Sequence, residues 1–364
     1  MNKIQYDETM AFHPGYYLKD MIEAMGITQE EFAKRLGTSG KTLSELLNGK
    51  INLSDSLALN LSKMFGTSVE VWLNLQKTYT RKVLEIERRI SLKDDLLLVK
   101  EIDYSYFVGI GAVPPVKKPA EKVDELLKYL NVSSLNVLSQ PDFLVNYRTA
   151  VSNSSEKNRL NSNAWVQTAL NIGSAYETNS FDLRKLRQKI PVIRRMTLQK
   201  PEQFVPELMD LFHSCGVAFV ILPYLKNSGV NGAVKWIHKD KVILAINNRR
   251  KYADTFWFSL FHEIGHVLQQ KVAMLIVSRD VAEMDEVNQN LEMKADEFAQ
   301  NTLIPAENYA SFIQNADFCE SAIKAFSKSI GIHPGIVVGR LQRDKIIRND
   351  RLNHFKEKYE MLVQ

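Results

Sequence analysis

Several features that reveal a protein's class are scarce in this sequence of 364 residues. It has two cysteines, Cys215 and Cys319, far apart in the chain. Two thiols cannot build a disulfide framework or a thiolate zinc cluster, and they fit a reducing cytosol in which both are buried. No apolar run approaches the roughly 18 residues of a membrane helix. Residues 1–11 are polar and lack the basic start and apolar centre of a signal peptide. We therefore expect a cytoplasmic protein that makes no contact with a membrane.

Outside residues 81–200, the sequence also lacks an excess of either positive or negative charge. The net charge is +5, but residues 81–200 hold 20 Lys/Arg against 13 Asp/Glu, a net charge of +7. The segments on either side are close to neutral. The basic middle is compatible with a nucleic-acid surface or with a solvated helical connector, and the connector is the simpler interpretation.

Residues 14–80 contain the start and stop signals of five short helices. Pro14 opens the first helix, and side chains that can cap a helix precede the next three at Thr28, Ser39 and Ser54. Glycine or Asn-Gly ends each of these helices. Five helices in so short a stretch predict a compact all-helical domain over residues 1–80.

A charged helical pattern continues over residues 81–100, the Gly- and Pro-rich stretch 109–119 breaks it, and residues 120–200 look helical again. We expect residues 81–200 to form a helical connector. Residues 217–222 then read as a strand, and residues 234–246 read as a hairpin that turns at 238–240. Helical patterns resume at Thr255 and dominate to the end. The sequence therefore predicts a mainly α protein with a small sheet (α+β), whose third domain covers residues 201–364.

The strongest chemical signal is the segment His262-Glu263-Ile264-Gly265-His266. Histidines at positions i and i+4 of a helix project from the same face, so both imidazoles can bind one ion. Apolar and aromatic residues flank the segment on both sides, as in a buried helix. A catalytic zinc usually has three protein ligands and keeps one position for water, so a third ligand is required.

A second helical segment, about 25 residues downstream, can supply it. Glu292 and Asp296 also lie at i and i+4. Glu292 can complete a set of two histidines and one glutamate, and Asp296 can accept the second ring N–H of a ligating histidine. The predicted metal is Zn²⁺, with Mn²⁺ as the alternative. Glu263, which is not a ligand, is predicted to act as the general base.

The residue that would stabilise an oxyanion is not evident from the sequence. Tyr309 and His238 are weak candidates.

These motifs resemble those of the ImmA/IrrE metallopeptidases. The resemblance rests on the segment from Phe256 to His266, on Glu292-x-x-Ala-Asp-x-Phe-Ala, on Leu303-Ile-Pro305 and on the stretch 330–342, and it covers roughly residues 200–345. It implies a zincin-like peptidase domain in which His262, His266 and Glu292 bind zinc and Glu263 is catalytic. Members of this family typically cleave a partner repressor.

The segment 28–50 resembles a phage-repressor helix-turn-helix, and the longer stretch 13–76 resembles the HigA branch of antitoxins. The resemblance implies a lambda-repressor-like domain of five helices that binds operator DNA as a homodimer. Base contacts are expected from the outward positions of the second helix of the motif, and phosphate contacts from residues around it. The residues are Ser39, Gly40, Lys41, Thr42, Ser44 and Glu45 for the bases, and Gln29, Asn48 and Lys50 for the phosphates.

Two features oppose strong DNA binding. Residues 1–80 carry 8 Lys/Arg against 9 Asp/Glu, and Gly40 offers no side chain where a base-reading residue often lies. A helical domain used only for protein contacts is therefore the alternative.

Three functions fit this organisation. The first is a transcriptional regulator or antitoxin whose zinc-dependent endopeptidase domain serves as sensor or output. The second is a site-directed protease that uses the helix-turn-helix to find a DNA-bound repressor and cleave it. The third is a protein that neutralises a cognate toxin and holds a metal without catalysis.

Overall fold

The computed structural model describes residues 3–140, 143, 155–248, 252–270, 275–279 and 286–359. The chain divides into two compact units, Met1–Asp94 and Asp95–Gln364. The predicted connector, residues 81–200, spans the boundary between them. Among the described residues, no helix has both the length and the apolar character needed to cross a membrane.

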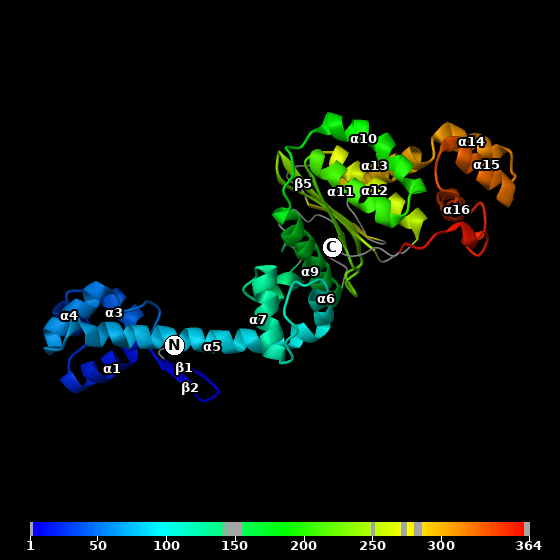
Figure 1. The fold of residues 1–364 in the computed structure, drawn as a ribbon. Helices are drawn as coiled ribbons and strands as arrows, with labels where there is room; N and C mark the ends of the chain where they lie inside the picture. The colour runs from blue at the N-terminus through cyan, green and yellow to red at the C-terminus, as the bar shows by residue number, and fades with distance from the viewer. Residues whose placement is uncertain are drawn as a thin grey trace. The chain divides into compact units, whose positions relative to one another are not determined.

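The first unit is a hairpin followed by helices (Figure 1). Its elements are β1 (Lys3–Tyr6), β2 (Thr9–Phe12), α1 (Pro14–Met25), α2 (Gln29–Leu36), α3 (Gly40–Leu47), α4 (Asp55–Phe65) and α5 (Val69–Leu98) up to Asp94. The strands β1 and β2 pair antiparallel. The hairpin was not predicted from the sequence, and α5 continues without a break into the segment that was expected to be a connector.

Local signals set the boundaries of these helices. The hydroxyl of Thr28 accepts the N–H of Glu31, and that of Ser39 accepts the N–H of Thr42. Gly37 ends α2 in the left-handed conformation, with φ of 72°, which a residue with a side chain rarely adopts. The predicted caps are therefore present, and they fix the turn between α2 and α3.

One apolar core holds the helices of the first unit together. It contains fully buried leucines from α1, α3 and α4 together with Phe32 of α2 and Trp72 of α5. Burial of these side chains is the main stabilising contribution to a unit of this size.

The second unit contains most of the helices and a four-stranded sheet. Its α-helices are α6 (Tyr104–Gly109), α7 (Pro119–Leu130), α8 (Asn136–Ser139), α9 (Glu156–Ala175), α10 (Leu183–Arg195), α11 (Pro201–Ser214), α12 (Ala253–Leu268), α13 (Glu286–Leu303), α14 (Ala306–Gln314), α15 (Glu320–Ile330) and α16 (Pro334–Arg343). The described part of this unit also contains the short 3₁₀ turns η1 (Val99–Glu101), η2 (Met196–Leu198) and η3 (Asn353–Phe355).

The sheet is mixed, with strands in the order β3-β5-β4-β6. Its strands are β3 (Val217–Leu222), β4 (Val230–His238), β5 (Lys241–Asn247) and β6 (Leu275–Arg279). β3 and β5 are parallel, whereas β4 runs antiparallel to both of its neighbours. The predicted strand and hairpin are confirmed, but β6 was missed.

Helices cover both faces of this sheet (Figure 1). Gly173 of α9 packs against Ile243 of β5 on one face. On the other face, alternate strand residues such as Val234 and Leu244 join the core formed by α11 and α12. Because strand side chains alternate between faces, both faces of β5 are apolar and buried. The expectation of a mainly α protein with a small sheet is confirmed.

The two cysteines differ in their surroundings, which corrects one expectation. Cys215 is buried, and burial raises the pKa of its thiol, whereas Cys319 is exposed at the start of α15. Cys319 directly precedes Glu320 and Ser321, so no apolar pattern around it predicts burial.

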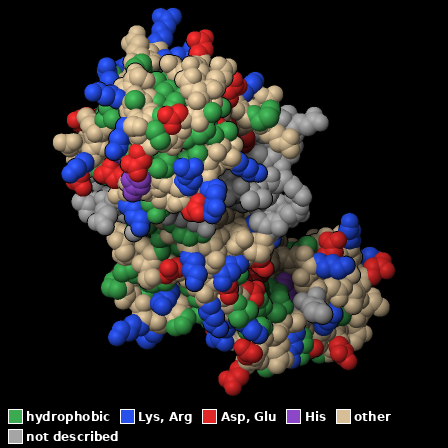
Figure 2. Space-filling model, turned by 90° about the vertical axis from the view of Figure 1, so that its right-hand side faces the viewer, with side chains coloured by type: hydrophobic (Ala, Val, Ile, Leu, Met, Phe, Trp, Pro, Cys, Tyr) green, Lys and Arg blue, Asp and Glu red, His purple; other side chains and the backbone are tan. Residues whose placement is uncertain are grey.

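Charged residues of both signs are mixed on the surface. On the face in Figure 2, Lys and Arg side chains alternate with Asp, Glu and apolar side chains, and neither sign forms a continuous field there. This face offers no broad basic surface for a polyanion.

Candidate functional sites

The metal motif lies on α12, a helix that is buried for most of its length. His262, Glu263 and His266 are 8 %, 1 % and 0 % exposed. Aromatic side chains on the same helix, including Trp257 and Phe261, fill the core around it. The apolar flanks that marked this segment in the sequence therefore serve to bury it against the sheet.

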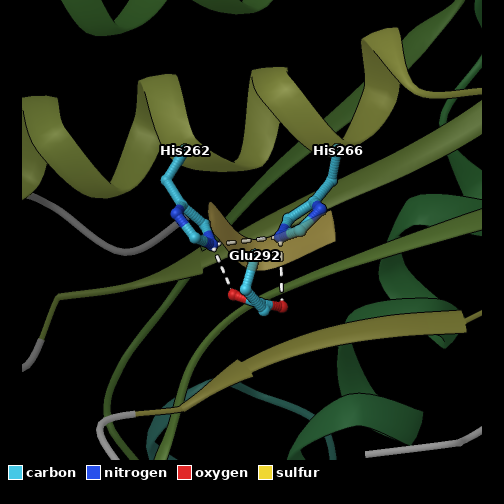
Figure 3. Close-up of side chains that lie close together, drawn as sticks. All are labelled: His262, His266 and Glu292. Carbon is cyan, nitrogen blue, oxygen red and sulfur yellow. Dashed lines mark hydrogen bonds and ion pairs between the residues drawn. The ribbon is translucent and has the colours of Figure 1, made fainter. Parts of the chain in front are cut away.

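Two imidazoles and one carboxylate converge on one point (Figure 3). The Nε2 atoms of His262 and His266 are 3.0 Å apart. Glu292, from α13, places one carboxylate oxygen 3.1 Å from Nε2 of His262 and the other 3.3 Å from Nε2 of His266. These are the three residues whose donor atoms form a possible metal cluster among the described residues.

The spacing of these donors fits a small divalent ion. Ligand atoms at about 2.0–2.1 Å from a tetrahedral zinc lie about 3.3 Å from one another. The three donor distances of 3.0, 3.1 and 3.3 Å are close to that value. The donor types, imidazole and carboxylate, are also those that zinc accepts.

The outer nitrogen of each imidazole is held by a hydrogen bond. Nδ1 of His262 donates to Asp296, at 2.8 Å, and Nδ1 of His266 lies 3.2 Å from the side-chain oxygen of Gln269. The amide nitrogen of Gln269 in turn donates to the carbonyl of Leu291, one residue before Glu292. Both imidazoles are thus oriented with Nε2 toward the shared point.

Sequence reasoning identified Asp296 but missed Gln269. The signal was available, because Gln269 lies three residues after His266, directly after the last residue of α12, and can reach its ring. The sequence does not show where the carbonyl of Leu291 lies in space. This carbonyl accepts the amide of Gln269 and so fixes its orientation.

A glycine allows the two helices of the site to approach closely. A Cβ atom at Gly265 would lie 3.0 Å from Cα of Ala295 and 3.3 Å from the ring of Phe298. Ala295 is flanked by Glu292 and Asp296 on the same helix. The close contact of α12 with α13 at this point therefore brings both carboxylates to the histidines.

Glu263 points to the sheet side of α12, where it meets β4. A Cβ atom at Gly232 would collide with the carboxylate of Glu263. The absence of a side chain at Gly232 thus leaves the space in which the carboxylate lies, beside the two histidines of the motif.

Opposing effects set the pKa values of the ligands. Burial lowers the pKa of His262, but hydrogen bonds to Asp296 and Glu292 and the charge of Glu263 outweigh it and raise the pKa to about 10. Burial raises the pKa of Glu292, but its hydrogen bonds with both histidines lower it to about 2. The site therefore strongly favours a positive charge beside its carboxylates.

Tyr309 and His238, the two candidates for oxyanion stabilisation, are not members of the cluster of His262, His266 and Glu292. The Tyr309 hydroxyl donates to Asp344, at 2.8 Å, and the guanidinium of Arg340 lies over its ring at 4.5 Å. His238 is 58 % exposed at the turn between β4 and β5. It lies six residues from Gly232 along β4, which is about 20 Å in an extended strand.

The predicted DNA-reading residues lie on or beside α3. Ser39, Gly40 and Lys41 are exposed at its N-terminal end, while Thr42, Ser44 and Glu45 are half-buried. The hydroxyls of Ser39 and Thr42 are hydrogen-bonded to each other at 2.8 Å. Each hydroxyl therefore already makes one hydrogen bond within the helix cap.

The predicted phosphate contacts surround this helix. Gln29 starts α2, and Lys50 follows α3, and both are exposed. Asn48 ends α3, where its amide donates to the carbonyl of Ser44 and its oxygen accepts Lys19. Lys19 was not identified from the sequence, yet this contact adds a cation beside the C-terminal end of α3.

Family models match both parts of the chain. A model described as helix-turn-helix matches residues 18–72, and a model described as an IrrE N-terminal-like domain matches residues 219–318. The first range includes α2 and α3, and the second includes His262, His266 and Glu292. Both family resemblances expected from the sequence are therefore confirmed.

Individual relatives agree with the first of these matches. The HTH-type transcriptional regulator YddM of Escherichia coli is 32 % identical over 85 residues, which are 23 % of this chain and 88 % of YddM. The chain belongs to the helix-turn-helix regulators. The present chain is also 43 % identical over 68 residues to virulence-associated protein A' of Dichelobacter nodosus, and the match covers 18 % of the chain and 59 % of that protein. Antitoxin HigA-1 of Vibrio cholerae is 37 % identical over 57 residues, 16 % of the chain and 53 % of the antitoxin.

Removal of the outer hydrogen bonds should weaken metal binding without removing a ligand. We expect Asp296→Ala and Gln269→Ala each to lower zinc affinity by about 10–100-fold, because the imidazoles lose their fixed orientation. Competition with a chromogenic chelator measures this affinity. Glu297→Ala is the matched control, since Glu297 is exposed on the same helix and should bind zinc as the unaltered protein does. Equal affinity of the Asp296 and Glu297 variants would contradict the assignment.

Proposed function

We propose that this protein is a DNA-binding transcriptional regulator or antitoxin that carries a zinc-dependent endopeptidase. The observation that carries the proposal is the convergence of His262, His266 and Glu292 beside Glu263, in a chain that also has a helix-turn-helix. The IrrE N-terminal-like domain supports a peptidase activity, because it contains all four of these residues.

The proposed roles follow from where each side chain lies. His262, His266 and Glu292 would hold the ion, and Asp296 and Gln269 would keep the imidazoles in position. A bound zinc ion would polarise the peptide carbonyl and lower the pKa of a water molecule toward neutrality. Glu263 would accept the proton of this water and deliver it to the leaving amine. Its packing against Gly232 restricts its carboxylate to one side of α12.

The helix-turn-helix would bind operator DNA as a homodimer, with α3 in the major groove. Lys41 would donate to guanine and Glu45 would accept from cytosine, while Gln29, Asn48 and Lys50 would contact phosphates. The remaining positions of the predicted interface are Ser39, Gly40, Thr42 and Ser44.

A second candidate function has its own support. The similarity to antitoxin HigA-1 favours a chain that neutralises a cognate toxin, with a metal site that does not catalyse. A site-directed protease that cleaves a DNA-bound repressor is the third possibility, and here peptide cleavage would itself be the output.

Replacement of Glu263 separates these functions. Glu263→Gln should keep the three ligands and bind one zinc per chain, but should lower peptide cleavage by about 10²–10⁴-fold because the general base is lost. The measurement is mass-spectrometric detection of cleavage after co-expression with the proteins encoded beside its gene. Glu297→Gln is the control, because it changes an exposed glutamate of the same unit.

The outcome assigns the role of the site. Loss of cleavage with repression retained supports a regulator with a peptidase output, and loss of both supports the site-directed protease. If the unaltered, zinc-loaded protein cleaves none of these proteins and binds a toxin tightly, the peptidase proposal is wrong and the toxin-neutralising function stands.

The DNA interface has a separate test. Lys41→Ala should weaken binding to a duplex from upstream of its own gene by about 1–3 kcal/mol, measured by fluorescence anisotropy. Lys34→Ala is the matched control, because Lys34 lies on α2 and pairs with Glu30 at 3.0 Å. If both variants bind like the unaltered protein, α3 is not the reading helix.

A further inference from the structure

A cavity lies between α12, α13 and α16 of the second unit. Its volume is about 260 Å³. Its apolar walls come from one ring and three aliphatic side chains: Phe258, Leu303, Ile304 and Ile336. None of the four proposed zinc and catalytic residues lines it.

The cavity is next to the metal centre. Phe258 precedes His262 by one helical turn on α12, and Gln300 follows Asp296 by one turn on α13. The rings of Phe258 and His262 have centroids 6.3 Å apart. A group bound in the cavity would therefore lie beside the proposed peptidase site without occupying it.

Three charged side chains also line the cavity, and two of them are neutralised by the protein. Arg340 pairs with Asp344 at 2.6 Å. Asp254, which is 11 % exposed, pairs with Lys356 at 2.8 Å. Both charges are thus paired within the protein, while Oδ1 of Asp254 is buried without a hydrogen-bond partner among the described residues.

Arg343 is the third charge, and it is arranged differently. Its guanidinium lies over the ring of Phe258, 4.1 Å from the centroid, and the residue is exposed to solvent at the mouth of the cavity. Within the described residues it forms no ion pair with a carboxylate. Two nearby carboxylates act on its charge, and both have other partners. Asp296 is hydrogen-bonded to His262, and Asp344 pairs with Arg340. Stacking thus fixes a planar cation at an apolar cavity, with its donors available.

We propose that this cavity binds a small ligand that has a carboxylate on an apolar body. Arg343 would donate two parallel hydrogen bonds to the carboxylate, the geometry for which a guanidinium is suited. The apolar walls would cover the body, and the amide of Gln300 would supply one more polar contact. The volume is slightly below the roughly 300–1,000 Å³ of ligand pockets, which suits a ligand the size of one aromatic residue.

A carboxylate of this kind has two sources. It is either a free carboxylic acid that acts as an effector or the C-terminal residue of a bound peptide. The proposal does not rest on peptidase activity, because binding is measured directly.

Calorimetry with paired probes tests the proposal on the full chain. The free probe is 3-phenylpropanoate, and its neutral partner is 3-phenylpropanamide. The peptide probe is acetyl-Ala-Ala-Phe with a free carboxylate, and its partner is the C-terminal amide. At least one acid should bind about ten-fold or more tightly than its amide, since the amide loses the charge-assisted hydrogen bonds. The acid that binds more tightly identifies the source.

Variants then locate the binding. Arg343→Gln should weaken binding of that acid by about ten-fold or more, and Arg343→Lys should give an intermediate loss because it keeps the charge but not the planar pair of donors. Arg348→Gln is the control, because Arg348 is 81 % exposed and pairs with Asp350. The comparison of acid with amide needs no variant, so it decides even if Arg343→Gln fails to fold.

Repetition on chelator-treated protein distinguishes the cavity from the metal centre. Binding should survive the removal of metal. The proposal is overturned if each acid binds no better than its amide, if a folded Arg343→Gln variant binds like the Arg348→Gln control, or if the binding disappears with the metal.

Discussion

The close contact between α12 and α13 at Gly265 is the constraint on which the candidate metal centre depends. α12 alone presents two imidazoles on one face, but the carboxylates come from another segment. Because Gly265 has no side chain, Ala295 can pack against the backbone of α12. Glu292 and Asp296 flank Ala295, so this single contact places one carboxylate between the Nε2 atoms and another on the outer nitrogen of His262. A bulkier residue at either position would separate the donors.

Short-range patterns in the sequence predicted the parts of the structure that short-range physics determines. The spacing of His262 and His266 placed both rings on one helix face, and Ser39 marked the start of α3. Features that depend on tertiary contact were not predicted. The strand β6 follows α12 along the chain and returns to pair with β4, and the sequence around it has no turn signal that specifies this partner. Nothing in the sequence distinguishes Gln269 and Arg343 from other polar residues. Only the structure shows that Gln269 contacts His266 and that Arg343 lies over the ring of Phe258.

The two parts of the chain present different chemistry. The helix-turn-helix unit is built from caps and a small apolar core, and it exposes one short helix with polar residues at its start. The second unit buries its reactive groups, so Glu263 and His266 are almost inaccessible to water in this structure. Under the two proposals, the second unit would bind a metal at its buried site and a small carboxylate in the neighbouring cavity. The cavity beside Phe258 and the metal centre share α12, which gives a physical route by which one could influence the other.

X-ray absorption spectroscopy at the metal edge of the purified full chain tests the central claim most directly. The account predicts one divalent ion per chain, with two imidazole nitrogens and oxygen ligands at about 2.0–2.2 Å. The imidazole contribution should fall by half in His266→Ala. A chain without stoichiometric metal, or a spectrum with the same two imidazoles after that substitution, would contradict the assignment of His262, His266 and Glu292 as the metal ligands.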